Sequence, residues 1–456
     1  MRHNTRHQSE ALSPWGMTRA AEVRIRPLEA PFQSTVVIPG SKSFTNRALI
    51  IAALAGGHSV LQYPLLSDDS YWCVEALRKL GVDMSVNRSE GIIEINGVGD
   101  AALHTTGDAA SIYLGSAGTI ARFLPAVIAA RGSGAVKLSS SEQLAHRPMR
   151  ELIQALRTLG AEIEISHSSR TFPMTIKGGS MRGGEVTISG KRSSQFISAL
   201  LIAAPLAPHP VTIHISDHIV QSDYVRMTLE MMARFGVEVT HDVALTHFEI
   251  LPQRYQAQRL QLEADASTAT YFLALAAATQ SEITIPNLNL NTRQPDIMFI
   301  DHLSAMGCEV IRADNTLTLR GPTQLKGHLH FDFNPCSDST PALASIAPFA
   351  SGPIEVSGVE HIRAHECDRL KVLADTLNQA GVMTREHRDG LTIQPTLEAP
   401  HMFSADPHDD HRMAMAFSVM AIAGRGGLIE DPACVSKTCP QFYAMMRTLG
   451  VNYTLY

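Results

Sequence analysis

The stretch Asp265–Ala278, DASTATYFLALAAA, starts with small polar residues and continues as an apolar, Ala-rich segment. This pattern predicts a helix that is buried on all sides, because no face of it is polar enough for solvent. Five other stretches share the pattern: KSFTNRALIIAAL from Lys42, SAGTIARFLPAVIAA from Ser116, SSQFISALLIAA from Ser193, SDSTPALASIAPFA from Ser337 and DDHRMAMAFSVMAIA from Asp409.

These six stretches recur at a nearly constant spacing. A fixed period over a whole chain is typical of one supersecondary unit that is used repeatedly. We therefore expect six units, each opening a helix whose N-terminus can hold an anion. The equivalent positions, at intervals of 76, 76, 72, 72 and 72 residues, are Ser43, Thr119, Gln195, Ser267, Ser339 and His411.

A second set of helical segments has the same period. Each ends at a glycine, the usual left-handed stop after a helix. Most are followed by alternating residues such as AEIEI at 161–165, which predicts a strand with one buried face. Each unit should therefore hold one buried helix, one surface helix and several short strands. Chance similarity among ordinary α/β segments is the alternative, and two sets in phase disfavour it. The glycines are Gly81, Gly160, Gly236, Gly307, Gly381 and Gly450.

The bulk properties favour a soluble cytosolic enzyme of two or three domains. A formal net charge of −6 argues against a broad nucleic-acid surface, and the apolar runs are too short or too charged to span a membrane. We expect residues 1–21 to be a disordered leader, with Met17 as an alternative start or, less favoured, a transit peptide. The six cysteines have no CxxC spacing, which favours reduced thiols: Cys73, Cys308, Cys336, Cys367, Cys434 and Cys439.

The candidate chemistry lies at the starts of the buried helices. Lys42, Ser43 and Arg47 place an ammonium, a hydroxyl and a guanidinium at one helix start, which suits a phosphate or carboxylate. An N-cap with solvated charges is the plainer interpretation, and the apolar helix behind disfavours it. Four further cations, each of which could instead be a salt-bridge partner, are Arg147, Arg369, Arg412 and Lys437.

Two other features near helix starts are less specific. The loop Gly115–Thr119 would allow a ligand close to backbone N–H groups, although helix packing explains its small residues equally well. The run His408–His411 could be a metal site, but its spacing does not match a familiar helical ligand pair. We expect no metal and no organic cofactor.

Seven motifs stand in one order along the chain: PGSKSFTNR, LGSAGT followed by Arg122, RSSQF, DAST followed by Tyr271 and Phe272, HECDRL, DDHRMAMA and SKTCP. From about Val23 onward the chain resembles the 5-enolpyruvylshikimate-3-phosphate synthase family, and the set of motifs is more specific than any one of them. The resemblance implies a two-domain, inside-out α/β barrel of six βαβαββ units with buried parallel helices. It implies one domain of residues 41–262 and another of residues 22–40 with 263–456.

The family transfers the enolpyruvyl group of phosphoenolpyruvate to the 5-hydroxyl of shikimate 3-phosphate by addition and elimination. The resemblance implies binding of shikimate 3-phosphate by Lys42, Ser43, Arg47, Ser193, Ser194, Gln195, Tyr224, Asp338 and His365. It implies binding of phosphoenolpyruvate by Lys42, Gly118, Arg147, Gln195, Glu366, Arg369, Arg412 and Lys437. A monomer is expected, and the family inhibitor glyphosate is expected to bind.

The resemblance also implies the proton transfers. Asp338 would be the base on the attacking hydroxyl, although it could equally cap the fifth buried helix or do both. Glu366 would donate a proton to the methylene carbon. A carboxyl among cations is a poor acid, so desolvation or a relay through Lys42 would have to offset this, and both possibilities stay open.

The sequence departs from the family pattern at four positions. Many members have Asn at Ser116, Lys at His365, Ser at Gln221 and Pro at Phe123. A histidine is only partly charged near neutral pH, so phosphate contacts at His365 could differ. The contact at Gln221 is in doubt, and Phe123 is expected to reshape the pocket near Gly118.

Two alternatives compete with this interpretation. The related UDP-N-acetylglucosamine enolpyruvyl transferase shares the fold, but it typically has Lys-Asn in the first motif and a loop Cys as acid, and neither occurs here in a matching context. A non-catalytic phosphometabolite-binding homologue is disfavoured because the acidic and basic candidates are all present. An assay of phosphate release with shikimate 3-phosphate, and then with the UDP-sugar, distinguishes these two alternatives from the synthase.

Overall fold

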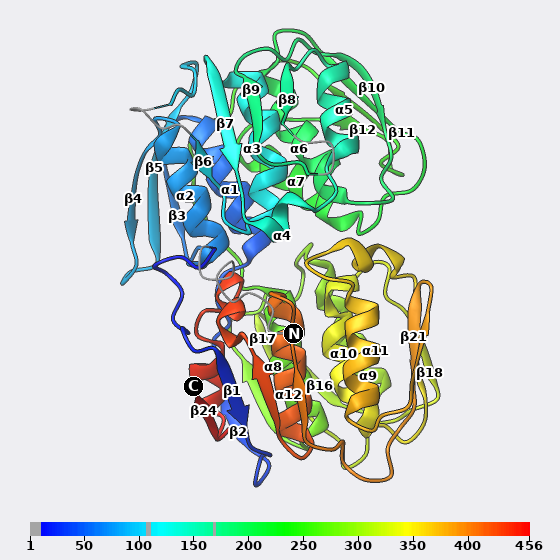
Figure 1. The fold of residues 1–456 in the computed structure, drawn as a ribbon. Coiled ribbons are helices and arrows are strands. Elements are labelled where there is room, and N and C mark those ends of the chain that lie inside the picture. The colour runs from blue at the N-terminus through cyan, green and yellow to red at the C-terminus, as the bar shows by residue number, and fades with distance from the viewer. Residues whose placement is uncertain (1–10, 106–110, 167–169) are drawn as a thin grey trace. The chain divides into compact units, whose positions relative to one another are not determined.

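The computed structural model describes residues 11–105, 111–166 and 170–456 of the chain (Figure 1). It divides into two compact units, each with its own core. One unit consists of the residues up to Pro14 together with Gly40–Leu262, and the other of Trp15–Pro39 together with Glu263–Tyr456. The chain therefore passes from one unit to the other three times.

The first unit contains three four-stranded sheets and three buried helices. These helices are α1 (Lys42–Leu54), α3 (Gly118–Arg131) and α6 (Ser194–Ala203), and α3 packs against both of the others. In sheet order, the strands are β14 (Arg259–Gln261), β3 (Gly56–Gln62), β5 (Ile92–Val98) and β4 (Asp83–Asn87); β6 (Ile112–Tyr113), β7 (Ala135–Ser139), β9 (Met174–Lys177) and β8 (Ile163–Ile165); β10 (Gly184–Ile188), β11 (Val211–Ile215), β13 (His247–Ile250) and β12 (Thr240–His241).

The second unit repeats this arrangement. Its buried helices α8 (Ala266–Ala278), α10 (Thr340–Ile346) and α12 (His411–Ala423) pack against one another. In sheet order, the strands are β16 (Glu309–Ala313), β17 (Thr316–Arg320), β15 (Glu282–Ile285) and β2 (Gln33–Thr35); β18 (Leu329–Asp332), β19 (Ile354–Ser357), β21 (Gly390–Ile393) and β20 (Thr384–His387); β22 (Phe403–Ala405), β23 (Gly427–Glu430), β1 (Glu22–Ile25) and β24 (Tyr453–Leu455).

All six sheets have one parallel pair and two antiparallel pairs in the same order. The predicted sixfold repeat and the α/β fold class are thus confirmed. Three sheets borrow a strand from a distant part of the chain: β14 closes the sheet of β3, β2 joins β15, and β1 lies between β23 and β24.

The two predicted kinds of helix are both present. In α8 every residue from Ala266 to Ala277 is buried, as expected for an apolar helix with no polar face. The helices of the second set bury one face and expose the other, and all six end at a glycine whose φ lies between +82° and +98°. Only glycine adopts this conformation without a steric cost. The second set comprises α2 (Asp68–Lys79), α5 (Arg150–Thr158), α7 (Asp223–Arg234), α9 (Phe299–Ala305), α11 (Arg369–Gln379) and α13 (Phe442–Thr448).

The expected disordered leader needs a correction. Residues 1–10 lie outside the described residues, whereas Ala11, Ser13, Trp15 and Thr18 are buried. Ser13 is fully buried, and both its backbone N–H and its hydroxyl donate to Asp68. A buried polar residue with two hydrogen bonds is part of the folded structure rather than a solvated tail. Among the helices of the described residues, none is long and apolar enough to cross a membrane.

Candidate active site

The start of α1 carries Lys42 and Ser43 in the first unit. Ser41 has an extended backbone and caps the helix, with its hydroxyl accepting from Phe44 N at 3.5 Å. Lys42 Nζ lies 3.7 Å from Oδ2 of the buried Asp69 in the first turn of α2. The cation is therefore held beside a helix N-terminus, where an anion is stabilised.

Arg47, one turn later, is nearly inaccessible. Its guanidinium donates to Thr228 Oγ1 at 2.7 Å, to the Ser43 carbonyl at 3.0 Å and to the Tyr224 carbonyl at 3.1 Å. It also lies over the rings of Phe123 and Tyr224 at 5.4 and 5.8 Å. Burial lowers the pKa of Arg47 to about 10, which still leaves it charged at neutral pH. Arg47 thus fixes Ser43 and the Tyr224 backbone.

This position of Arg47 also explains the departure at Phe123. The Phe123 ring is fully buried under the guanidinium rather than exposed in the loop at Gly118. Its role in the structure is therefore to pack against Arg47.

The remaining candidates of the first unit stand at two other helix starts. Ser193 caps α6 by accepting from Gln195 N at 3.2 Å, and Ser194 is the first residue of that helix. Gly118 is the first residue of α3, and a Cβ placed there would come within 2.5 Å of Arg147 Nη1. The Arg147 side chain therefore lies directly against the backbone of the glycine loop.

In the second unit Arg369, the first residue of α11, organises a buried ionic network. Its Nε donates to Asp410 Oδ2 at 2.8 Å, its Nη1 to Asp338 Oδ1 at 2.9 Å and its Nη2 to Glu366 Oε2 at 3.0 Å. Burial lowers the pKa of Arg369, but Asp410, Glu366 and Asp338 outweigh burial, so its pKa is raised. This guanidinium is permanently charged and rigidly placed.

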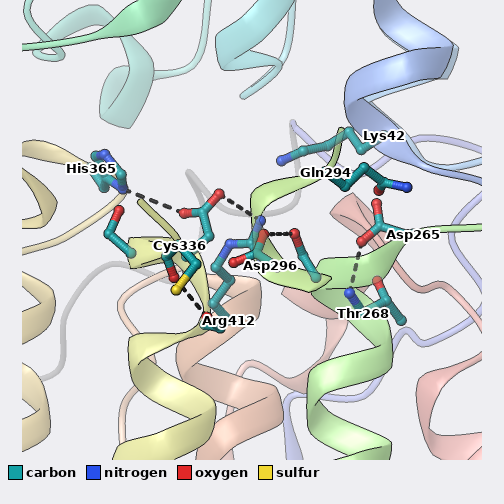
Figure 2. A network of polar contacts seen from close by, with 12 residues as sticks. Lys42, Asp265, Thr268, Gln294, Asp296, Cys336, His365 and Arg412 are labelled. Atoms are coloured by element: carbon teal, nitrogen blue, oxygen red, sulfur yellow. Dashed lines mark hydrogen bonds and ion pairs between the residues drawn. The ribbon is translucent and has the colours of Figure 1, made fainter. Parts of the chain in front are cut away.

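Asp338 belongs to the same network and contacts Arg369 and Arg412. Figure 2 labels His365, Arg412 and Asp296 from this part of the second unit. Asp338 accepts from Arg412 Nη2 at 2.9 Å through Oδ2, while Oδ1 faces Arg369 and lies 3.8 Å from His365 Nδ1. Burial, followed by the Arg369 charge, holds the pKa of His365 well below its usual value. His365 is therefore neutral at pH 7 and accepts a hydrogen bond from Arg369 Nη1 at 3.1 Å.

Glu366 joins two of the predicted cations. Its Oε1 lies 3.4 Å from Lys437 Nζ, and its Oε2 accepts from Arg369. The sequence left open whether these cations bind anions or pair with acidic side chains. In the second unit the three cations Arg369, Arg412 and Lys437 are paired with carboxylates, which offset the cost of burying their charge.

Three buried polar residues of the second unit, two of which belong to or lie beside this network, were not predicted as site residues. Asp410 caps α12 by accepting from Arg412 N at 2.9 Å and also holds Arg369. Asp296 is buried and accepts from Ser267 Oγ. Burial and the Asp338 charge raise the pKa of Asp296 to about 7. Gln294 Oε1 accepts from Ala266 N at 3.1 Å at the start of α8. Only Asp410 had a sequence signal, the DDHR motif.

The alternative of a metal site at 408–411 has no support in the geometry. The His408 side chain lies 3.4 Å from Asp406, and the Asp410 carboxylate accepts hydrogen bonds from Arg369. In the described part of the chain, no three His, Cys, Asp or Glu side chains are grouped as a metal site requires.

Comparison with known proteins places this geometry in a family. The family model described as EPSP synthase (3-phosphoshikimate 1-carboxyvinyltransferase) matches residues 28–446. A relative from Halalkalibacterium halodurans, named 3-phosphoshikimate 1-carboxyvinyltransferase 2, is 42% identical over 98% of this chain and 99% of its own length. A relative from Trichormus variabilis, named 3-phosphoshikimate 1-carboxyvinyltransferase, is 38% identical over 92% of this chain and 97% of its own.

A solved structure supports the fold. An EPSP synthase from Acinetobacter baumannii superimposes with a TM-score of 0.78 at 24% identity, over 95% of this chain and 99% of that one. At this identity the likeness concerns the fold alone, while the family model and the relatives extend it to sequence. The chain therefore belongs to the EPSP synthase (3-phosphoshikimate 1-carboxyvinyltransferase) family.

Proposed function

We propose that this chain transfers the enolpyruvyl group of phosphoenolpyruvate to the 5-hydroxyl of shikimate 3-phosphate, with release of phosphate. Family membership over residues 28–446 carries the proposal. The ionic network around Arg369 supports it, because it offers fixed cations for anions beside carboxylates that can move protons.

Anion binding is divided among helix starts. We assign shikimate 3-phosphate to Lys42, Ser43 and the start of α6, with Arg47 and Tyr224 supporting Ser43. The hydroxyls and N–H groups there suit a phosphate. The remaining shikimate 3-phosphate contacts assigned here are Ser193, Ser194, Gln195, Asp338 and His365.

Phosphoenolpyruvate is assigned to the guanidinium and ammonium groups. Arg147 lies against the Gly118 backbone, where no side chain keeps a ligand away. Arg412 and Lys437 are each held by a carboxylate, Asp338 and Glu366 respectively. A bound phosphate and carboxylate would share these cations with the carboxylates. The full set is Lys42, Gly118, Arg147, Gln195, Glu366, Arg369, Arg412 and Lys437.

Asp338 and Glu366 are assigned the proton transfers. Asp338 accepts two charge-assisted hydrogen bonds from Arg369 and Arg412, which favour its ionised form, the form that takes a proton from the attacking hydroxyl. The hydroxyl oxygen then bonds to C2 of phosphoenolpyruvate while C3 gains a proton. Loss of a C3 proton and of phosphate completes the reaction. Glu366 is proposed as the donor to C3, with Lys42 as the alternative.

Phosphate release measures this function directly. We expect release with shikimate 3-phosphate plus phosphoenolpyruvate and none with UDP-N-acetylglucosamine as acceptor. Asp338→Asn should abolish turnover while Asp375→Asn, at an exposed ion pair with Lys371, should not change it. Release with the UDP-sugar alone would identify the related transferase, and release with neither acceptor would leave a binding protein. We further propose that the protein is a cytosolic monomer. Sedimentation of the purified protein tests the monomeric state.

A further inference from the structure

Residues Ala11–Pro14 precede the part of the chain that matches the family model, which begins at residue 28. They nevertheless belong to the first compact unit, whereas Trp15–Pro39 belong to the second. Family membership therefore assigns these residues no role. Their contacts within the first unit lead to the helix starts described above.

One contact fixes the segment to the start of α2. Ser13 N and Ser13 Oγ both donate to Asp68 Oδ1, at 2.9 and 2.5 Å. All the groups are buried, so the pair is shielded from competing water. Asp68 is followed directly by Asp69, whose carboxylate pairs with Lys42. Ser13 therefore holds Asp68, the residue next to Asp69, and Asp69 is the ion-pair partner of Lys42.

A second contact fixes the segment to the glycine loop. Trp72 Nε1, one turn along α2, donates to the Ala11 carbonyl at 2.8 Å. The same indole nitrogen lies where a side chain on Gly115 would be, since a Cβ there would approach it to 2.3 Å. Gly115 has a φ of +55° and begins the loop to Gly118. The Trp72 indole therefore contacts both the Ala11 carbonyl and the backbone at Gly115.

We propose that Ala11–Pro14 is a positioning segment for the anion site of the first unit. It holds Asp69 against Lys42 through Ser13 and Asp68, and it holds the Gly115 loop through Trp72. The proposal rests on the proposed function. The segment leaves Lys42 itself in place and acts on it only through Asp69, so we expect a larger effect on substrate affinity than on the chemical step.

The test uses Trp72 as a reporter. The chain has two tryptophans, so Trp15→Phe leaves Trp72 as the only one. In this background Ser13→Ala removes one of the two hydrogen bonds to Asp68. We expect greater acrylamide quenching of Trp72 and a KM for either substrate that is raised about 3- to 10-fold, the factor for one lost buried hydrogen bond, with kcat within about twofold.

A matched control separates positioning from stability. Ser180 is also a buried serine of the first unit, and its hydroxyl accepts from Glu162 N at 3.0 Å and donates to the Lys177 carbonyl at 2.6 Å. Ser180→Ala should lower the melting temperature without changing KM or Trp72 quenching. Equal KM changes in the two variants would overturn the proposal, because they would reflect general destabilisation.

Two further results would also overturn it. If Ser13→Ala exposes Trp72 but leaves KM unchanged, the segment docks without positioning the site. If Trp72 quenching stays unchanged, Ser13 does not anchor the segment. The dissociation constant of shikimate 3-phosphate, measured by calorimetry, gives the same comparison without turnover. A parent protein that binds it but releases no phosphate would contradict the proposed function alone.

Discussion

Asp410 Oδ2 accepts a hydrogen bond from Arg369 Nε at 2.8 Å, while its Oδ1 accepts from the backbone N–H of Arg412 at 2.9 Å. One carboxylate thus caps α12 and also orients the first residue of α11. Asp410 thereby positions two candidate phosphoenolpyruvate ligands, Arg369 and Arg412, since Arg412 is the second residue of the helix that Asp410 caps. The separation of these cations is therefore set by the fold before any ligand binds.

Asp410→Asn should both destabilise the protein and abolish turnover. The variant leaves the Arg369 cation buried with one carboxylate fewer, and breaking a buried pair costs about 3–5 kcal/mol. Urea unfolding and phosphate release measure the two effects. Asp375→Asn is the control, because its pair with Lys371 is exposed and should contribute less than about 1 kcal/mol. A small loss of unfolding free energy and of phosphate release that is equal in both variants would contradict the role given to Asp410.

Lys42→Met should lower turnover by about 100-fold or more, because a cation at a helix start stabilises charge that the reacting groups carry. The free energy of unfolding should change by less than about 1 kcal/mol, since the ion pair of the partly accessible Lys42 with Asp69 is long, at 3.7 Å. Lys371→Met, at an exposed lysine, serves as the comparison. If the free energy of unfolding falls as strongly as turnover, Lys42 has a structural role.

Gly118→Ala should raise the KM for phosphoenolpyruvate by about tenfold with little change in stability. The new methyl group would meet Arg147 Nη1 at 2.5 Å, and the far end of this flexible side chain can move away at low cost. The displaced guanidinium would then no longer reach the ligand. Gly56→Ala is a suitable control, because a Cβ there meets nothing closer than 3.9 Å. An unchanged KM for phosphoenolpyruvate would show that Arg147 does not bind this substrate.

The stability of the second unit should fall in mild acid because of His302. Burial lowers the pKa of His302 to about 4 in the folded protein, where the ring stacks on Phe333. Between about pH 6.5 and 4 the unfolded chain binds a proton that the folded protein does not, so stability rises with pH there. From pH 7 to pH 5 the loss should be about 2 kcal/mol.

The variant His302→Phe should lose this part of the pH dependence, as measured by urea unfolding at both pH values. His58→Phe, at an exposed position, is the control for replacing a histidine by phenylalanine. If both variants behave like the parent protein, another group causes the acid sensitivity.

The repeat could be predicted from the sequence because its signals are local. A run such as Ala266–Ala278 without a polar face can only be buried, and Gly381 or Gly450 ends a helix through its own backbone. The order of strands within each sheet needed the structure, because pairing depends on contacts between distant segments. The entry of β1 between β23 and β24 is an example.

Several residues of the candidate site were predicted because a motif marks a helix start. Lys42, Arg369 and Arg412 stand in such motifs, and the structure places Arg369 and Arg412 in one network. Asp296 follows no recognisable pattern, and its contacts to Ser267 and Asp338 arise from tertiary packing. The docking of Ser13 on Asp68 was missed for the same reason, since a short polar segment reads as a tail.

The strands that join a sheet from a distant part of the chain determine the order in which the two units fold during synthesis. By residue 262 the ribosome has produced every strand of the first unit, including β14. Strand β1 must wait for β23, about 400 residues later, which takes roughly 20 to 80 seconds at ordinary translation rates. The two units therefore mature in sequence, and the Arg369 network forms only after synthesis is nearly finished. Until then the early strands of the second unit have unpaired edges, which makes this interval the one in which nascent chains most need a chaperone.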